Sequence, residues 1–325
     1  MRVAITGATG FLGGALAHAL ARRGADVVAL SRPGSDRSGL RHAHLTWREC
    51  DVTSPRGLEH ALEGADLVVH AAGRLGEAGV PEEAYRRLNV EGTRNVLAAA
   101  LGSPAPPRVL HLSSAGVLGV TGRTAAPEEA PYAPRNPYER SKAESERVAL
   151  EFARRGLQVV VARPGFVYGP GDRHVLGLFR AIQRGRFFYV GAGEHLCQPT
   201  FIDDAVDGIL LCLRAGAAGG IYHVTGPRAV TFRELGDAVA AALGVRPPWL
   251  RLPRWAATLV AAGLEAAGAA TRRKPPLSRA GVDFFGQDRL FSWRRAHDEL
   301  GYTPRHDLGS GLPLAVAWYR ERRLL

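Results

Sequence analysis

The 325-residue chain contains little cysteine and shows no export signal. Its three cysteines, Cys50, Cys197 and Cys212, have neither CxxC nor CxxxC spacing, so the sequence predicts neither a disulfide framework nor a cysteine zinc site. The chain opens directly into a strand-like segment at 2–6, without a charged leader and an apolar stretch before a cleavage site. We therefore expect a cytoplasmic protein without bound metal.

Lysine is almost absent, although the chain is strongly basic. Lys142 and Lys274 are the only lysines among 42 basic residues, and arginine therefore supplies most of the formal charge of +11. Such a charge can indicate a nucleic-acid or anionic-membrane partner. However, no dense basic block exists beyond 272–274, and no nucleic-acid motif accompanies it. We expect a small-molecule substrate and no nucleic-acid partner.

Short apolar runs alternate with segments of helical period through the first half of the chain. The strand-like runs are 3–6, 26–30, 67–70, 109–113 and 159–162, and the helix-like segments are 11–23, 82–101 and 137–155. This alternation predicts an α/β fold, a doubly wound parallel sheet of Rossmann type with helices on both faces. Further on, 164–199 is typical of loops over a site, 201–214 of a helix, and 221–224 of a strand that returns to the main sheet.

A glycine-rich turn joins the first predicted strand to the first predicted helix. It contains Gly7, Thr9, Gly10, Phe11, Leu12 and Gly13. Glycines in this context allow a tight turn, close approach of the backbone to a pyrophosphate, and close packing of helix on strand. The helix N-terminus adds N–H groups and the positive end of a dipole. We expect this turn to bind a dinucleotide, the alternative being an ordinary glycine-rich turn.

The ends of the second and third strand regions bear on cofactor choice. Arg32 stands where a carboxylate would bind the ribose 2'-hydroxyl of NAD, and a guanidinium suits a 2'-phosphate. The sequence therefore favours NADP(H) over NAD(H), although Arg32 could also be an ordinary surface arginine. Asp51 and Val52 could contact the adenine, and Asp51 could also cap a helix after Thr53.

Tyr138 and Lys142 stand one helical turn apart, at i and i+4. A nearby ammonium favours the phenolate form of tyrosine, which can then exchange a proton with an alcohol or ketone. Ser113 and Ser114 end a predicted strand, where ligands bind in open α/β sheets. We expect Ser114, Tyr138 and Lys142 to be catalytic, with one of the two serines structural.

Together these motifs resemble the extended short-chain dehydrogenases/reductases. They are the glycine turn, the segments 70–73, 89–93 and 163–170, and Ser114, Tyr138 and Lys142. The resemblance implies that Ser114 orients the substrate oxygen, Tyr138 is the general acid/base, and Lys142 also binds the nicotinamide ribose. It further implies a set of cofactor-binding residues, namely Ala71, Ala72, Gly73, Asn89, Pro164 and Val167. For Asn89, a structural role inside a helix is the alternative.

Departures from the family's patterns narrow the activity. Dehydratases of sugar nucleotides carry an acidic residue beside the active-site serine, whereas this chain has Ala115-Gly116. Gly165 and Gln198 likewise stand where epimerases often have Asn and an upstream Arg. Segments 275–282 and 299–304 are similar to bacterial relatives of 3β-hydroxysteroid dehydrogenase and dihydroflavonol reductase. We expect hydride transfer between a ketone and a secondary alcohol on an apolar, steroid-, lipid- or flavonoid-like substrate.

Two alternatives remain for the function. One is a nucleotide-sugar epimerase, and the other is a non-catalytic nucleotide-binding scaffold. The intact Ser114, Tyr138 and Lys142 argue against the scaffold.

We expect an NAD(P)-binding Rossmann domain at 1–165 with about 201–224, and a smaller, mainly helical substrate-binding region at 166–200 and 225–325. Within segment 255–274, the apolar stretch 255–270 is too short to span a bilayer, which needs about 20 apolar residues. The segment indicates either a peripheral membrane contact or a packed helix, and the family resemblance adds a homodimer as an expectation.

Overall fold

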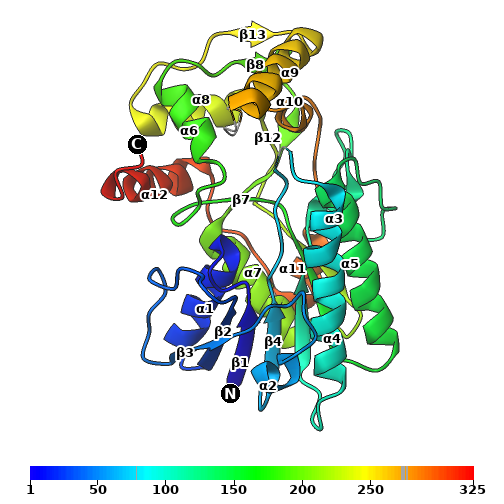
Figure 1. Ribbon diagram of the computed structural model, residues 1–325. Coiled ribbons are helices and arrows are strands. Elements are labelled where there is room, and N and C mark those ends of the chain that lie inside the picture. The colour runs from blue at the N-terminus through cyan, green and yellow to red at the C-terminus, as the bar shows by residue number, and fades with distance from the viewer. Residues whose placement is uncertain (78, 272–274, 276) are drawn as a thin grey trace.

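A seven-stranded parallel sheet forms the centre of the computed structural model, which describes residues 1–77, 79–271, 275 and 277–325 (Figure 1). Its strand order is β11-β6-β5-β4-β1-β2-β3. The strands are β1 Arg2–Thr6, β2 Asp26–Ser31, β3 Leu45–Glu49, β4 Leu67–His70, β5 Arg108–Leu112, β6 Val159–Pro164 and β11 Ile221–Val224. The expected Rossmann-type sheet is confirmed, and β11 joins its edge beside β6.

Helices cover both faces of this sheet (Figure 1). Alternate residues of β1 belong to different clusters: Val3 and Ile5 pack with α1 (Phe11–Arg22) and α7 (Ile202–Ala215), whereas Ala4 packs with the opposite layer. That opposite layer includes α2 (Leu58–Leu62), α4 (Gly92–Leu101) and α5 (Pro137–Arg154). Burial on both faces explains why the strands read as continuous apolar runs.

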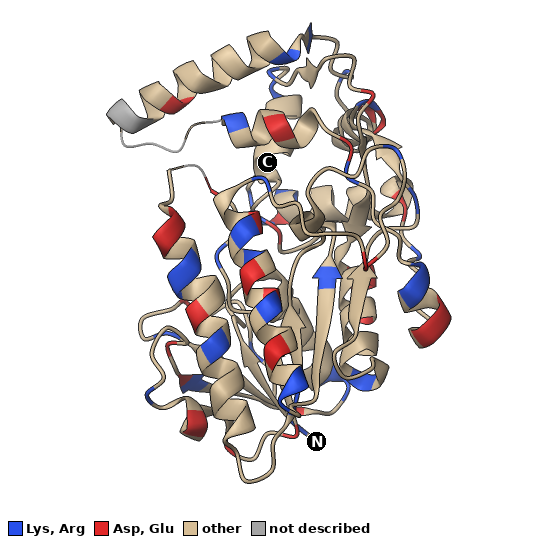
Figure 2. Cartoon of the chain, turned by 90° about the vertical axis from the view of Figure 1, so that its right-hand side faces the viewer, with Lys and Arg blue, Asp and Glu red and all other residues tan. Residues whose placement is uncertain are grey.

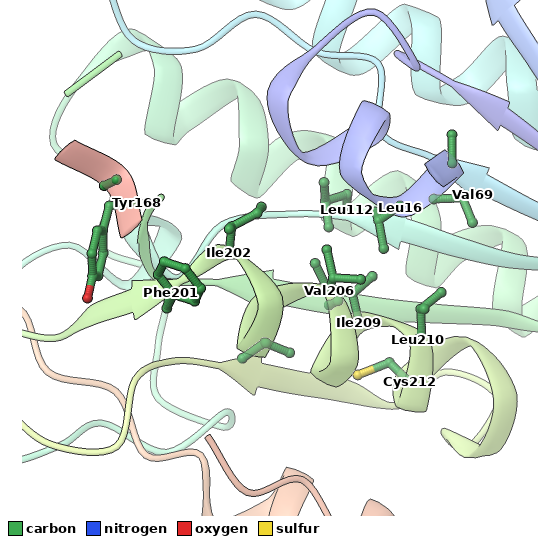
Figure 3. Packing of buried hydrophobic residues seen from close by; sticks show 14 of the residues in the cluster. Leu16, Val69, Leu112, Tyr168, Phe201, Ile202, Val206, Ile209, Leu210 and Cys212 are labelled. Atoms are coloured by element: carbon green, nitrogen blue, oxygen red, sulfur yellow. The ribbon is translucent and has the colours of Figure 1, made fainter. Parts of the chain in front are cut away.

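The packing of α7 explains how a helix distant in sequence completes the helical layer that contains α1. Val206, Ile209 and Leu210 lie on the side of α7 that faces the sheet, near Leu112 of β5 and Leu16 of α1 (Figure 3). All five side chains are buried. This apolar contact places α7 beside α1.

The helix expected over 82–101 is interrupted by a wider turn. It consists of α3 (Glu82–Tyr85), a π-helical segment η1 (Arg86–Glu91) and α4. Such π turns inside helices occur frequently at functional sites. Here the π turn carries Asn89.

The remaining elements form a second lobe above the carboxyl edge of the sheet (Figure 1). They comprise β7 Phe166–Tyr168, α6 Leu176–Gln183, β8 Tyr189–Val190, β9 Leu196–Cys197, β10 Pro199–Phe201, β12 Val230–Thr231, α8 Phe232–Leu243, β13 Arg251–Leu252, α9 Arg254–Thr271, α10 Arg279–Phe285 and α12 Leu308–Glu321. One later helix, α11 (Arg294–Leu300), instead packs against α7 and β11. No helix in the described part of the chain has the length and apolarity to cross a membrane.

Candidate active site

The predicted site residues follow the carboxyl ends of neighbouring strands. Gly7 follows β1, Arg32 follows β2, segment 71–73 follows β4, and Ser114 closely follows β5. Pro164 is the last residue of β6. Because these strands are parallel, all five positions lie along one edge of the sheet, where ligands bind in open α/β folds.

Only glycine fits at two positions of the turn. Gly7 has φ of +71°, and a Cβ built on it would lie 2.6 Å from the backbone of Ala71 and Ala72. A Cβ on Gly13 would lie 2.2 Å from the Gly7 carbonyl oxygen. The turn is closed by the Gly10 N–H, which donates to the same oxygen at 2.9 Å. The glycines therefore bring strand, helix and the loop after β4 into direct backbone contact.

The N-terminus of α1 fits the diphosphate of a dinucleotide. Its N-cap is Gly10, no side chain caps it, and its first turn has no acidic residue. The N–H groups of that turn and the positive helix end are therefore available to an anion. Thr9 is exposed, whereas Phe11 and Leu12 are partly buried beside the turn.

The carboxyl end of β2 carries two arginines. Arg32 is exposed and has no ion-pair partner within the described residues. Arg37, which sequence reasoning missed, donates from Nε to the Ser31 hydroxyl at 2.9 Å and from its Nη2 to Glu49 at 2.7 Å. Its position was not predicted because the loop between 32 and 45 has no periodic pattern. Arg32 thus directly follows β2, and the Arg37 guanidinium lies against the last residue of that strand.

The structure corrects the alternative role given to Asp51. Its carboxylate accepts from both the N–H and the hydroxyl of Thr53 at 2.9 Å, which forms an Asx turn. The next helix, α2, begins only at Leu58, so Asp51 does not cap it. Val52 is buried, and its carbonyl accepts from the side chain of Asn95 at 2.9 Å.

Local sequence determines where α5 begins and therefore how Tyr138 and Lys142 are presented. Asn136 is the N-cap, and its side chain accepts from the Glu139 N–H at 2.9 Å. Pro137 occupies the first helical position, which proline favours. With the helix starting there, Tyr138 and Lys142 lie one turn apart on the same face.

Ser113 and Ser114 have different partners. The Ser114 hydroxyl lies close enough to the Tyr138 phenol to lower its pKa, and it accepts from the Gly116 N–H at 3.2 Å. In contrast, the Ser113 hydroxyl is buried and donates to Glu146 at 2.6 Å. The geometry therefore brings Ser114 to the phenol and leaves Ser113 in the packed interior.

Burial dominates the electrostatics of the tyrosine and the lysine. It raises the pKa of Tyr138 to about 12, and the hydrogen bond with Ser114 opposes this only in part. It also lowers the pKa of Lys142 to about 8, while the Glu146 charge acts in the opposite direction. The Lys142 ammonium donates to the Leu112 carbonyl at 2.6 Å. Lys142 is not among the groups that shift the pKa of Tyr138, so the expected stabilisation of phenolate by Lys142 is not seen, and the phenol keeps its proton at neutral pH.

Asn89 connects the catalytic helix to the loop after β4. Its side-chain N–H groups donate to the Ser141 hydroxyl at 2.8 Å and to the Arg74 carbonyl at 3.2 Å. Its side-chain oxygen accepts from the Arg74 N–H at 2.7 Å. Gly73 lies against the same oxygen, since a Cβ there would be 3.3 Å away. Asn89 thus holds the 71–74 loop in place from inside a helix.

The last two predicted cofactor-binding residues lie farther along the same edge. Pro164 is buried at the end of β6, and the Gly165 N–H that follows it donates to the Val224 carbonyl at 3.0 Å. Val167 is partly buried in β7, where it pairs with Thr200 of β10. These pairings fix the chain as it leaves the main sheet.

A buried ion pair behind the serines was missed by sequence reasoning. Arg163 and Glu146 are 2.6 Å apart, with side chains 1% and 0% exposed. The Tyr132 hydroxyl donates to the same carboxylate at 2.7 Å, as does Ser113 at 2.6 Å. Glu146 stands at i+4 from Lys142, and this spacing was a signal that could have found it. The pair holds β5, α5 and β6 together.

A second buried pair joins the C-terminal segment to the catalytic helix. Arg289 donates to Glu139, the neighbour of Tyr138, at 2.7 Å. The Arg289 backbone N–H also donates to the Leu196 carbonyl at 2.9 Å. No local pattern could have predicted this contact, because its partners are 150 residues apart in sequence.

Comparisons with known proteins agree with this geometry. A model of the NAD-dependent epimerase/dehydratase family matches residues 3–225. The chain is 29% identical to a 2-alkyl-3-oxoalkanoate reductase from Stenotrophomonas maltophilia, over 96% of this chain and 97% of the relative. It is 30% identical to sterol demethylase protein B from Methylococcus capsulatus, over the whole of both chains.

Among solved structures, one similar protein is a dTDP-glucose 4,6-dehydratase from Streptomyces venezuelae with NAD and TYD bound. The two chains share 28% identity with a TM-score of 0.81, over 99% of this chain and 98% of that one.

Proposed function

The chain belongs to the NAD-dependent epimerase/dehydratase family, and on that premise we propose that it interconverts a ketone and a secondary alcohol on an apolar substrate with NADP(H). It is an NAD(P)-dependent oxidoreductase of the extended short-chain type. The observation that carries the proposed chemistry is that Ser114 and Tyr138 come together, with Lys142 one turn along the same helix, at the edge of the sheet that holds the glycine turn.

In the direction of reduction, Ser114 holds the substrate carbonyl oxygen and Tyr138 donates its proton to that oxygen. A nicotinamide cofactor held at this edge would provide hydride chemistry, to the carbonyl carbon in reduction and from the alcohol carbon in oxidation. Lys142 would hold its ribose and lies on the same helix face as the phenol. Burial keeps the phenol protonated at neutral pH, as a proton donor must be, and the raised pKa at the same time makes it a weaker acid than free tyrosine.

Two positions favour an oxidoreductase over the nucleotide-sugar epimerase. A Cβ on Gly165 would lie 3.0 Å from a methyl group of Thr225, so a larger residue there requires movement. Gln198 uses its amide inside the protein: it donates to the Gly226 carbonyl at 2.8 Å and accepts from the Phe291 N–H at 3.1 Å. Neither position offers a free side chain to a sugar diphosphate.

The immediate neighbourhood of Ser114 also supports reduction over dehydration. The two residues that follow Ser114 are the buried Ala115 and Gly116, and neither carries a carboxylate. The nearest acidic side chain to Gly116 is that of Glu139, which Arg289 and the Arg135 N–H both bind at 2.7 Å. A carboxylate engaged in this way is not free for the proton transfer that dehydration needs.

An apolar oxo compound is the substrate class we propose. The reductase relative is named for a 2-alkyl-3-oxoalkanoate, and the second relative for sterol demethylation. Both names describe a hydrocarbon-rich molecule, in agreement with the similarity of segments 275–282 and 299–304 to steroid and flavonoid reductases.

NADP(H) is the cofactor we favour, because Arg32 directly follows β2, the Arg37 guanidinium lies at the end of that strand, and guanidinium groups form charge-assisted bonds to a 2'-phosphate. Similar solved structures contain NAD, so the preference requires a direct test. We expect Arg32→Ala to weaken NADP(H) more than NAD(H) by about tenfold or more, as for the loss of one charged hydrogen bond. Arg23→Ala, at the far end of α1, is the matched control. An unchanged ratio of the two dissociation constants would remove Arg32 from the cofactor site.

The activity itself can be tested by two parallel assays. One follows nicotinamide absorbance with 2-alkyl-3-oxo acids and hydroxysteroids, and the other follows conversion of UDP- and dTDP-sugars by chromatography. We expect net redox turnover in the first assay. Sugar interconversion without net cofactor consumption would replace the proposal by the epimerase, and cofactor binding without turnover in either assay would favour the scaffold.

The division into regions is also part of the proposal. Residues 1–165 and about 201–224 would form the nucleotide-binding domain, and 166–200 with 225–325 the substrate-binding region, with α11 lying against the former. We further propose a homodimer and a cytoplasmic location. The latter rests on the three cysteines, which are buried and unpaired.

A further inference from the structure

Large apolar side chains are exposed at the outer end of the second lobe. Trp249 is 83% exposed, Trp255 69% and Leu259 65%, and Leu250 and Val260 are exposed beside them. These five account for most of the nine large hydrophobic residues that are exposed in the described chain. Scattered exposed apolar residues need no explanation, but a cluster of this kind marks an interaction surface.

Helix α9 buries its small side chains and exposes its large apolar ones, the opposite of the usual arrangement on a water-facing surface. Ala257 and Ala261 are buried against Val282 of α10, so the small side chains face the protein. Trp255 and Leu259, one turn apart, face outward. An amphipathic helix on a water-facing surface normally buries its large apolar residues. The outward face of α9 is therefore suited to an apolar environment.

Helices α9 and α10 contain few charged residues, which an apolar environment would disfavour. Glu265 is the one acidic residue in the α9 sequence and Asp283 the one in α10, and each is paired with an arginine. Glu265 lies 2.7 Å from Arg279, and Asp283 lies 2.7 Å from Arg254. The contrast with α5 is plain in Figure 2, where that helix carries many charged residues and α9 hardly any.

Two further arginines make this end positive. Arg246 and Arg251 are exposed, and neither has an ion-pair partner within the residues that the structure describes. They flank Trp249, and a tryptophan ring is suited to the boundary between lipid headgroups and hydrocarbon. We propose that Trp249, Leu250, Trp255, Leu259 and Val260, with Arg246 and Arg251, form a surface that docks peripherally on an anionic lipid bilayer; we call it the α9 surface.

The sequence expectation of a membrane contact over 255–274 thereby moves toward the N-terminus. The structure adds the loop at 246–251 and the first half of α9, whereas 272–274 lie outside the described residues. The inference does not depend on the proposed reaction, because none of these residues belongs to the Ser114 site.

An anionic bilayer fits the α9 surface better than a second copy of this chain. Two copies would bring together the unpaired arginines Arg246 and Arg251 of both, on proteins that each carry a formal charge of +11. Like charges at an interface oppose association, whereas phosphatidylglycerol headgroups neutralise them.

The test is flotation of the purified full chain with vesicles of phosphatidylcholine alone or mixed with phosphatidylglycerol. We expect binding to the mixed vesicles that salt weakens. Trp249→Ser with Trp255→Ser should lower the partition coefficient by about tenfold or more, since two exposed aromatic side chains then insert no longer. Arg251→Gln should lower the partition coefficient by about fivefold, because one basic residue near an anionic surface contributes about 1 kcal/mol to binding.

Leu314→Ser is the matched control, because Leu314 is an exposed apolar residue on α12, away from the α9 surface. It should leave vesicle binding unchanged, and NADP(H) affinity should be unchanged in every variant, which shows that the fold is intact. The proposal would be overturned if the wild-type protein does not bind vesicles that contain phosphatidylglycerol, or if the double tryptophan variant binds them as wild type does. So would loss of self-association in the double variant without any vesicle binding by wild type, which would identify a second copy as the occupant.

Discussion

The buried ammonium of Lys142 leads to a prediction that can be measured at a single atom. The side chain is 6% exposed, and its amine donates to the Leu112 carbonyl. Burial lowers its pKa from the usual 10.5 to about 8. At 1.36 kcal/mol per pKa unit, this difference corresponds to roughly 3 kcal/mol of unfavourable free energy for the charged form.

The sign of the pH dependence follows from the same values. The unfolded chain keeps the Lys142 proton up to about pH 10.5, whereas the folded chain releases it near pH 8. Between these two pH values the unfolded state binds more protons, so the free energy of unfolding should rise with pH, by at most ~3 kcal/mol. Below about pH 7 both states are protonated, and Lys142 adds no pH dependence.

The assay uses the scarcity of lysine. With [ε-13C]lysine, Lys142 and Lys274 give the only two side-chain signals, and Lys142→Met identifies one of them. We expect that signal to titrate near pH 8 and the rise in stability to be absent from Lys142→Met. A midpoint at pH 10 or above would refute the reasoning, because it would mean that burial does not penalise the charge.

Two substitutions test the architecture of the site. Gly13→Ala should destabilise the protein by about 1–3 kcal/mol and weaken NADP(H) binding, because its Cβ would lie 2.2 Å from the Gly7 carbonyl oxygen. The control is Gly177→Ala on α6, whose Cβ would meet open space. Equal behaviour of the two variants in urea unfolding and cofactor titration would contradict the packing described. Glu146→Gln should cost about 3–5 kcal/mol in urea unfolding, because Arg163 would then be a buried charge without a carboxylate; a loss below about 1 kcal/mol would show that the pair does not hold the fold together.

The parts of this fold that the sequence predicted are those determined by neighbouring residues. The glycine turn, the start of α5 and the strand at 221–224 all have local signals, namely glycine spacing, a capping residue before proline, and a short apolar run. The π turn at Arg86–Glu91 has no such signal, because its sequence continues the helical period on both sides.

The parts that sequence reasoning missed depend on tertiary contact. Arg289 reaches Glu139 across 150 residues, and its partner could not be identified from either segment alone. The pKa of Tyr138 was expected to fall beside Lys142, but burial, which a sequence pattern does not measure, raises it. Residue types and spacing therefore indicated the chemistry, and packing determines its protonation state.

The proton-donor role of Tyr138 is the central claim, and Tyr138→Phe tests it most directly. The variant removes only the phenolic hydroxyl, so NADP(H) should bind nearly as to wild type, while reduction of an identified oxo substrate should slow by about a hundred- to ten-thousand-fold. Tyr222→Phe, whose hydroxyl donates to Glu299 away from the site, is the control and should keep wild-type turnover. Retention of more than about a tenth of wild-type activity by Tyr138→Phe would contradict the assignment, because general acid/base groups typically contribute at least a hundredfold.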